Sequence, residues 1–301
     1  MRLVVALGGN AIAGERGADP VSQQEAVEGA CVQIAELVEH GHDVVITHGN
    51  GPQVGNLLLK NDLARHVVPP VGLDWCVAQT QATLGFLIVT ALEARLPGRF
   101  VATVVTRVLV DAEDPGWQTP SKPIGRHVSA EEAEERIAAG EAWQDRGEKG
   151  WRRIVPSPLP LEILDRAAIV ALIEDGAIVV ACGGGGIPMV REDGVLRGVE
   201  CVLDKDLTAA LLARTVGADV LLIATDVEAA AIGYGTDRQE WLGEVEADRL
   251  QALLDAGEFA GGSMGPKVEA ALRFARDGGR SVITSLERLR EGVEGSVGTR
   301  V

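Results

Sequence analysis

The stretch LVVALGGNAIAG, from Leu3 to Gly14, begins with five consecutive apolar residues and continues with Gly8, Gly9 and Asn10. An apolar run of this length is typical of a strand that is buried on both faces of a parallel sheet. Two glycines after the strand allow a sharp turn and let a ligand approach bare backbone N–H groups. If a helix follows, its free N–H groups and its dipole favour the binding of an anion.

The same pattern, an apolar strand followed by glycines, occurs twice more in the sequence. The apolar strand expected at 43–47 runs into the glycine loop at 48–51, and the strand expected at 177–182 runs into four glycines at 183–186. The carboxyl ends of parallel strands lie along one edge of a sheet, where ligands of α/β proteins bind. We therefore expect the three glycine loops to contribute to one anion-binding site.

Composition indicates a globular α/β protein. The chain has 301 residues, of which 46% are hydrophobic and only 3% aromatic, so aliphatic side chains must fill the core. No signal-peptide pattern and no apolar run of membrane-spanning length is evident, which predicts a soluble, cytoplasmic protein that does not bind membranes. The four cysteines form no CxxC pair and are expected to be buried thiols.

The formal net charge of −16 argues against nucleic-acid binding through the general surface. A polyanion must bind in a local positive pocket, so the five lysines are informative. Lys122 lies between two prolines, Lys205 stands at an expected helix start, and Lys267 lies in the first turn of another helix. There a cation opposes the dipole, and a bound phosphate would offset this effect. An exposed loop position for Lys122 and a solvated helix cap at Lys205 are the alternatives, whereas Lys60 and Lys149 are expected to be surface charges.

Two α/β lobes on one continuous sheet are predicted, with an insertion between them. The segment 101–110 is expected to be one strand. Residues 111–160 then contain six prolines and three of the five tryptophans, which favours an inserted, ordered subdomain. The first loop has neither P-loop nor GxGxxG spacing, and no Ser-His-Asp pattern is evident. Glycine loops and lysines without a covalent nucleophile favour phosphoryl transfer, which mainly requires positioning and positive charge.

Seven motifs, spread in order over nearly the whole chain, resemble the carbamate kinase family of the amino acid kinase superfamily. They are ALGGNAI (6–12), HGNGPQVGNLL (48–58), PSKPIG (120–125), GWRRIVPSP (150–158), CGGGGIP (182–188), LDKD (203–206) and GSMGPK (262–267). Several relatives in the superfamily have lysine after the first two glycines. Asn10 stands there in this chain, as in carbamate kinases, whose protruding subdomain supplies a lysine instead; Lys122 matches that lysine.

The resemblance implies a three-layer α/β/α sandwich with an open, mainly parallel eight-stranded sheet and a small protruding subdomain. It implies a single domain, 1–301, with an N-terminal lobe at 1–165 for carbamate or carbamoyl phosphate. This lobe includes the subdomain at 115–157, and the nucleotide lobe follows at 166–301. The expected reaction is reversible, Mg²⁺-dependent transfer between ATP and carbamate, giving ADP and carbamoyl phosphate, in a cytoplasmic homodimer of arginine or carbamoyl phosphate metabolism.

Site residues carried over from the family fall into three groups, and no protein ligand for Mg²⁺ is assigned. The groups are catalytic Lys122, Lys205, Asp206 and Lys267; substrate- and phosphate-binding Gly8, Gly9, Asn10, Gly49, Asn50, Gly51, Gly184 and Gly185; and nucleotide-binding Thr225, Asp226, Val227, Tyr234 and Met264. A superfamily kinase acting on a larger carboxylate and a catalytically silent nucleotide-binding sensor remain the alternatives.

Overall fold

Strand β1 (Arg2–Leu7) lies at the centre of the main sheet in the computed structural model, which describes residues 1–14, 19–259 and 263–301. Its neighbours are all parallel to it, from β15 (Arg280–Ser285) and β12 (Val220–Thr225) on one side to β2 (Asp43–His48), β9 (Ile178–Val180) and β3 (Val101–Thr103) on the other. The edge strand β16 (Thr299–Arg300) is antiparallel to β15. The described residues thus form seven strands in this sheet rather than the eight expected.

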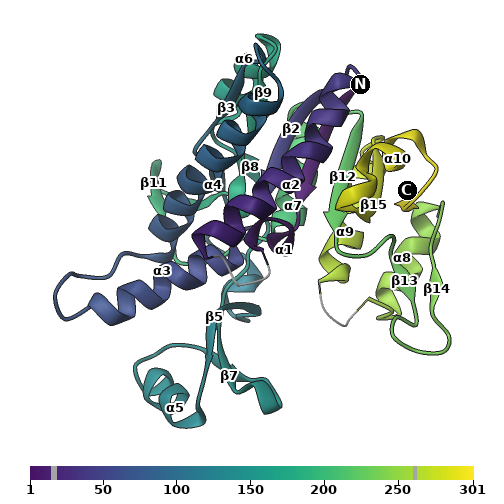
Figure 1. The fold of residues 1–301 in the computed structure, drawn as a ribbon. Coiled ribbons are helices and arrows are strands. Elements are labelled where there is room, and N and C mark those ends of the chain that lie inside the picture. The colour runs from purple at the N-terminus through teal and green to yellow at the C-terminus, as the bar shows by residue number, and fades with distance from the viewer. Residues whose placement is uncertain (15–18, 260–262) are drawn as a thin grey trace.

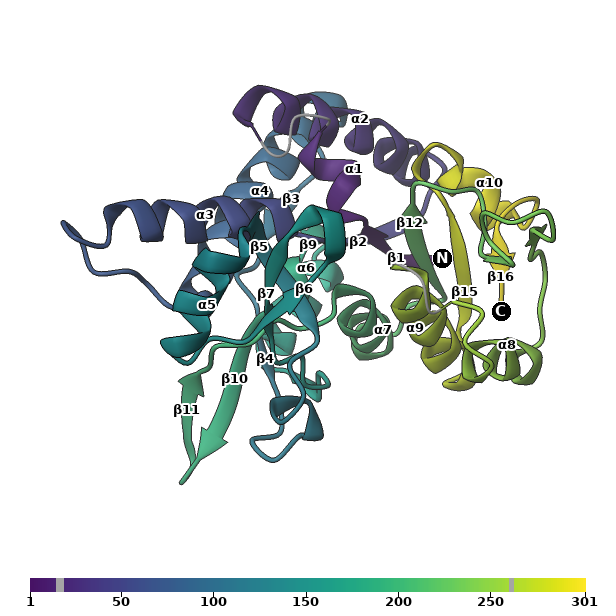
Figure 2. The ribbon, with the colours of Figure 1, turned by 90° about the horizontal axis from the view of Figure 1, so that it is seen from below.

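Helices cover both faces of this sheet. The described residues form the helices α1 (Gly9–Ala13), α2 (Pro20–Glu39), α3 (Gly51–Ala64), α4 (Leu73–Arg95), α5 (Ala130–Ala138), α6 (Arg166–Glu174), α7 (Lys205–Thr215), α8 (Ala247–Asp255), α9 (Met264–Arg276) and α10 (Leu289–Glu294), of which α5 lies away from this sheet. Figure 2 shows α2 and α10 on one side of the sheet and α7, α8 and α9 on the other. The architecture is therefore the predicted three-layer α/β/α sandwich.

Alternate residues of β1 explain why both faces are covered. Leu3, Val5 and Leu7 pack into a core with α2, α4 and α10, whereas Val4 and Ala6 pack into a second core with α6 to α9. Side chains of a strand point alternately to opposite faces, so a continuous apolar run requires a helical layer on each side. The reading of Leu3–Leu7 as a doubly buried strand is confirmed, and the four cysteines are buried free thiols as predicted.

The expectation of one strand over 101–110 is wrong, because the chain leaves the main sheet after β3. It enters a second sheet as β4 (Arg107–Leu109), beside β10 (Ile187–Glu192), β11 (Val195–Gly198) and β8 (Glu162–Ile163). The side-chain amide of Gln81 fixes this change of sheet. Its Oε1 accepts from the backbone N–H of Thr106 at 2.7 Å, and its Nε2 donates to the Thr106 carbonyl at 3.1 Å.

A small antiparallel sheet projects from the body between β4 and β8. It consists of β5 (Lys122–Val128), β7 (Trp151–Val155) and β6 (Trp143–Asp145), with α5 packed against it. Figure 1 shows it at the lower end of the molecule, away from the main sheet. Residues 122–155 correspond to the excursion expected from the prolines and tryptophans. We call them, with the flanking residues 115–121 and 156–157, the protruding subdomain.

The expected lobe boundary at residue 165 does not separate the strands of the main sheet into two groups. Strand β9 comes after this position in the sequence, yet it pairs with β2 and β3, which come before it. A remaining short hairpin, β13 (Ala231–Ile232) with β14 (Glu240–Trp241), lies on the C-terminal side. The two sets of strands thus share one continuous sheet, and the lobe boundary remains a proposal.

Helix α4 is long and apolar enough to cross a membrane by length and composition, contrary to the expectation that no segment would be. Its Leu84, Ile88 and Leu92 are fully buried beside α2 in the core. Such packing is typical of a central helix in a globular protein.

Candidate active site

The first and second glycine loops are in direct contact at the carboxyl ends of β1 and β2. The backbone N–H of Gly49 donates to the carbonyl of Leu7 at 3.0 Å. A Cβ atom built on Gly49 would lie 2.9 Å from the Cα and N atoms of Gly9, which is closer than a real Cβ tolerates. Glycine is therefore required at 49 so that the two loops can form one backbone surface.

The third loop closes against the second through Asn50. Gly184 has a φ of +66°, and a Cβ built on it would lie 2.0 Å from Nδ2 of Asn50. That amide is buried and donates to Oγ1 of Thr80 on α4 at 2.9 Å. All three loops therefore meet at one edge of the sheet, as the strand order requires.

His48 is completely buried beneath these loops. Its Nδ1 lies 2.8 Å from the carbonyl of Gly49, so this nitrogen carries the proton in the arrangement that forms a hydrogen bond. Burial lowers the pKa of His48 to about 4; the hydrogen bond to Gly49 opposes this shift, and the positive charge of Lys205 adds to it. The imidazole is therefore a neutral spacer between the second and third loops, where a Cβ on Gly183 would lie 2.5 Å from its ring.

Asp206 joins two of the predicted lysines in a buried cluster. The Nζ atom of Lys205 lies 2.8 Å from Oδ1 of Asp206, and Nζ of Lys267 lies 3.1 Å from Oδ2. All three side chains are largely buried: Lys205 is 12% exposed, Asp206 6% and Lys267 8%. Burial alone would raise the pKa of Asp206, but the two ammonium groups hold it below its ordinary value, so the carboxylate stays ionised.

Lys122 reaches the same region from the protruding subdomain. Its Nζ atom lies 2.5 Å from Oδ2 of Asp204, the residue that caps α7. Oδ1 of Asp204 accepts from the backbone N–H groups of Asp206 and Leu207, at 2.9 and 3.2 Å. The subdomain and the start of α7 are thus joined by one carboxylate.

A cavity of about 790 Å³ lies between the glycine loops, the start of α7 and the base of the subdomain. Five cationic and three acidic side chains line it, namely Lys122, Arg146, Arg152, Lys205, Lys267, Asp204, Asp206 and Glu269. The N-termini of α3, α7 and α9 also contribute residues to it. In a chain with a net charge of −16, this is the local positive pocket that the sequence predicted for a polyanion.

A second cavity of about 340 Å³ adjoins the first, because both are lined by Gly9, Ser263 and Lys267. Its other lining residues include Gly8, Thr225, Asp226, Leu286 and Glu287. Thr225 is the last residue of β12 and Leu286 follows β15, so this cavity extends the site along the same edge toward the C-terminal side. The two cavities together could hold a small anion and a larger phosphorylated ligand side by side.

Most predicted site residues lie in these two cavities. Gly9, Gly49, Asn50, Gly51, Gly184 and the four predicted catalytic residues line the larger one, and Gly8, Thr225 and Asp226 line the smaller. Gly185 is buried behind the loop against Leu203. The side chain of Asn10 lies outside the described part of the structure.

Three predicted nucleotide residues lie apart from both described linings. Tyr234 is exposed and contacts Trp241 edge-on at a centroid distance of 6.2 Å, while Met264 packs against the hydrophobic core. Val227 follows Asp226 without joining either lining. Their assignment to the nucleotide remains a prediction.

Sequence reasoning missed several residues of the site. Asp204 is absent from the predicted site residues, although it stands in the LDKD motif and contacts Lys122. Arg146 and Arg152 line the cavity, and Arg152 stands in the GWRRIVPSP motif. His48 was part of a quoted motif but carried no role. Membership of a motif was the available signal in three cases, and Arg146 had none.

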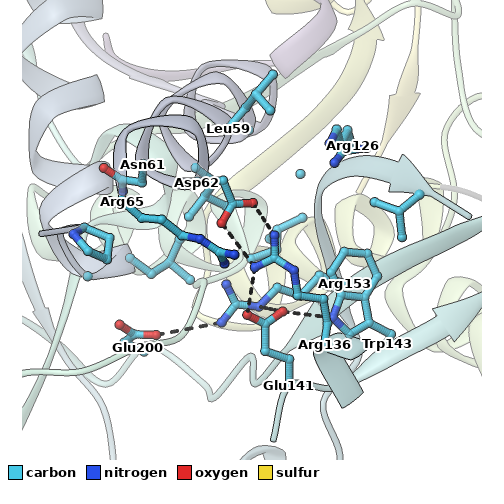
Figure 3. A pocket seen from close by; sticks show the side chains of 18 of the residues that line it. Leu59, Asn61, Asp62, Arg65, Arg126, Arg136, Glu141, Trp143, Arg153 and Glu200 are labelled. Carbon is cyan, nitrogen blue, oxygen red and sulfur yellow. Dashed lines mark hydrogen bonds and ion pairs between the residues drawn. The ribbon is translucent and has the colours of Figure 1, made fainter. Parts of the chain in front are cut away.

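A third cavity, of about 320 Å³, lies between α3 and the subdomain, outside the lysine cluster. Figure 3 shows Arg136 and Arg153 directed toward the acidic side chains of Asp62, Glu141 and Glu200. Arg136 of α5 donates to both carboxylate oxygens of Asp62 on α3, at 3.1 and 2.8 Å. Arg153 lies between Glu141 and Glu200, at 3.6 and 3.9 Å. We call these five residues the subdomain latch, because their charges are used to fasten the subdomain to the body.

A divalent cation finds few protein ligands at the lysine cluster. Both oxygens of Asp206 are engaged by lysines, and Asp204 is engaged by Lys122 and the α7 backbone. Within 1–14, 19–259 and 263–301, no group of three or more Asp, Glu, His or Cys residues is arranged to hold a metal. A metal ion bound here would have to bring most of its ligands with the substrate, as Mg²⁺ does with phosphates and water.

Chemically, the arrangement suits transfer of a phosphoryl group. Lysines from three separate segments and the N–H groups of glycine loops surround one space, and such groups stabilise charge that develops on phosphoryl oxygens. Cys31 and Cys201 are not suited to act as nucleophiles, because burial raises the pKa of each thiol to about 12.

The family follows from comparison with known proteins. Residues 1–285 match the amino acid kinase family. The chain is 47% identical to a carbamate kinase of Thermococcus kodakarensis and 44% identical to one of Pyrococcus furiosus, with 100% of this chain and 98% of each relative covered. It superposes with a TM-score of 0.93 on a carbamate kinase from Giardia lamblia bound to AMP-PNP, at 40% identity over 99% of this chain and 97% of that one. The chain therefore belongs to the amino acid kinase family and, within it, to the carbamate kinases.

Proposed function

We propose that the protein is a carbamate kinase, which transfers a phosphoryl group between ATP and carbamate to give ADP and carbamoyl phosphate, and the reverse. The observation that carries this proposal is the meeting of Lys122, Lys205 and Lys267 with three glycine loops around one cavity. The three lysines come from distant segments of the chain, so their convergence is a property of the fold rather than of local sequence.

Each group has a defined task in the proposed reaction. Carbamate lies on the backbone of the first two glycine loops, and the nucleotide extends from the lysines toward Thr225 and Asp226. An anionic carbamate oxygen attacks the γ-phosphorus, a new O–P bond forms, and the bond to the β-phosphate oxygen breaks with its electron pair leaving on ADP. The lysines stabilise the charge on the transferred group.

General base catalysis is unnecessary for this acceptor, because the attacking oxygen already carries negative charge. The neutral, buried His48 fits this requirement, since it is engaged with Gly49 rather than available to remove a proton. Mg²⁺, held mainly by nucleotide phosphates and water, would neutralise part of the phosphate charge.

The cellular setting is part of the same proposal. We expect a cytoplasmic homodimer that serves arginine or carbamoyl phosphate metabolism, as in the family it resembles. Four buried thiols without disulfides agree with a reducing compartment. Light scattering of the purified protein tests the dimer.

The test is formation of ATP from carbamoyl phosphate and Mg-ADP by pure, folded protein. The same panel includes acyl phosphates of larger carboxylic acids, such as acetylglutamyl phosphate. Turnover with carbamoyl phosphate alone supports the proposal. Turnover with a larger acyl phosphate alone assigns the protein to another activity of the superfamily, and tight ADP binding without any turnover indicates a nucleotide sensor.

A further inference from the structure

The two carboxylate oxygens of Asp204 contact two different parts of the protein, helix α7 and the protruding subdomain. Oδ1 accepts two backbone N–H groups at the start of α7, and Oδ2 accepts from Nζ of Lys122 at 2.5 Å. The Asp204 side chain is 11% exposed, whereas that of Lys122 is 34% exposed. A largely buried carboxylate, oriented by two backbone N–H groups, therefore contacts the end of a more exposed side chain.

The backbone around Asp204 is also attached to the subdomain. The N–H of Val202 donates to the carbonyl of Pro156 at 3.1 Å, just after β7. Val202 also packs with Ile124 and Val155 in a small apolar cluster. Lys122 pairs with Val155 in the β5–β7 register, so the contact with Asp204 forms where the subdomain meets the body.

Lys122 needs a counter-charge in this position. Lys205, Lys267, Arg146 and Arg152 line the same cavity and repel another ammonium group. A free lysine side chain also retains rotamer entropy, which favours many conformations in solvent over a single position. Asp206 is occupied by the other two lysines, and among the acids of the cavity Lys122 contacts Asp204.

We propose that Asp204 is a positioning residue that holds the Lys122 ammonium at the phosphoryl-transfer site. An ammonium group has three N–H donors, so the bond to Asp204 leaves two for phosphoryl oxygens. Asp204 thus orients Lys122 without consuming its capacity to bind the transferred group. The inference rests on the proposed function for its catalytic consequence but not for the ion pair itself.

The variant Asp204→Asn separates the two tasks, because asparagine caps a helix about as well as aspartate but carries no charge. Asp204→Ser provides a second capping residue. Asp165→Asn is the matched control, since Asp165 forms a part-buried ion pair with Arg107 at 2.7 Å outside the cavities described. Circular dichroism and thermal melting verify that each variant is folded.

The first readout is independent of turnover: the rate at which an amine-acylating reagent modifies Lys122, followed by mass spectrometry. We expect acylation of Lys122 to rise at least about threefold in Asp204→Asn and Asp204→Ser, because the ammonium group loses its partner, and to stay unchanged in Asp165→Asn. Unchanged acylation of Lys122 in both Asp204 variants overturns the proposal. Unfolding of both variants also overturns it, because the carboxylate then serves the structure of α7 instead.

The second readout is kcat for ATP formation, measured for each Asp204 variant in the wild-type background and in a Lys122→Ala background. Asp204→Asn should lower kcat about tenfold with little change in the KM for ADP, but less than about twofold in a Lys122→Ala background. Equal losses in both backgrounds contradict action through Lys122. If the wild-type protein shows no turnover, the proposed function fails, while the acylation result still decides the role of Asp204.

Discussion

The ammonium group of Lys267 lies 3.1 Å from Oδ2 of Asp206, across the space between α9 and α7. The opposite oxygen of the same carboxylate faces Lys205. One buried acid therefore sets the separation of two cations that stand 62 positions apart in the sequence. This cluster keeps positive charge in a buried region of the protein, where it acts more strongly on a phosphoryl group than in bulk water.

Replacing Asp206 by asparagine should move the alkaline limit of activity to lower pH. Burial already lowers the pKa of Lys205 below its ordinary value of 10.5, and the charge of Asp206 opposes that shift. Without the carboxylate the pKa of Lys205 falls further, so its ammonium form is lost at a lower pH as the solution becomes alkaline. Profiles of kcat/KM across the neutral and alkaline range should show this displacement.

The same variant should also be less stable, by about 3–5 kcal/mol, because two buried ammonium groups lose their counter-charge. Denaturant unfolding measures this loss. An alkaline limb that stays in place, or that moves to higher pH, would show that Asp206 does not control the charge of Lys205.

Replacing His48 by glutamine should flatten the acid dependence of stability. The pKa of His48 is about 4 in the folded protein and about 6.5 when exposed, so the unfolded chain takes up this proton first as the pH falls. The stabilising contribution of neutral His48 is complete above about pH 6.5. It is lost progressively down to about pH 4, by roughly 3 kcal/mol in total.

Denaturant unfolding at a series of pH values measures this difference. The His48→Gln variant should lose about 3 kcal/mol less than the wild type over that interval, although it is less stable at neutral pH. His66→Gln, at an exposed position, serves as the control and should keep the wild-type slope. An unchanged slope in His48→Gln would contradict the assignment of a neutral, buried imidazole.

Replacing Arg136 by glutamine should loosen the protruding subdomain. Arg136 makes the two-pronged contact with Asp62 in the subdomain latch, so its loss removes the charged link between α5 and α3 (Figure 3). Hydrogen exchange of residues 122–155 should accelerate while the main sheet keeps its protection. Turnover should fall, because Lys122 is carried by the same subdomain.

The control for this experiment is Arg290→Gln, which removes an exposed pair with Glu294 on α10. It should leave exchange in the subdomain unchanged. If Arg136→Gln also leaves that exchange unchanged, the latch does not hold the subdomain against the body.

The layers of the fold could be predicted because they depend on local patterns. The uninterrupted apolar run Leu3–Leu7 indicates a strand that is buried on both faces. Three strands that are each followed by glycines indicate loops at a shared edge of the sheet. The break within 101–110 could not be predicted. Most of these residues are β-branched and suit a strand, and the change of sheet is held by Gln81, which reaches Thr106 from α4.

The candidate site shows the same limit. The sequence predicts a helix start at Lys205, and the structure confirms it, with Asp204 as the N-cap of α7. The sequence could not indicate that one oxygen of Asp204 is left for Lys122, because the two residues are 82 positions apart. The pairing forms only when the subdomain packs against the body. The excess of cationic over acidic side chains in the cavity also arises only then.

The most direct test of this account measures single-turnover ATP formation from carbamoyl phosphate and Mg-ADP, together with ADP binding, in Lys122→Ala, Lys205→Ala and Lys267→Ala. Lys60→Ala on the exposed face of α3 is the matched control. We expect each of the three variants to fold and to slow the transfer step by about 100-fold or more. Lys122→Ala should retain near-normal ADP affinity, and Lys60→Ala should equal the wild type. Wild-type transfer rates in folded Lys205→Ala and Lys267→Ala would contradict it.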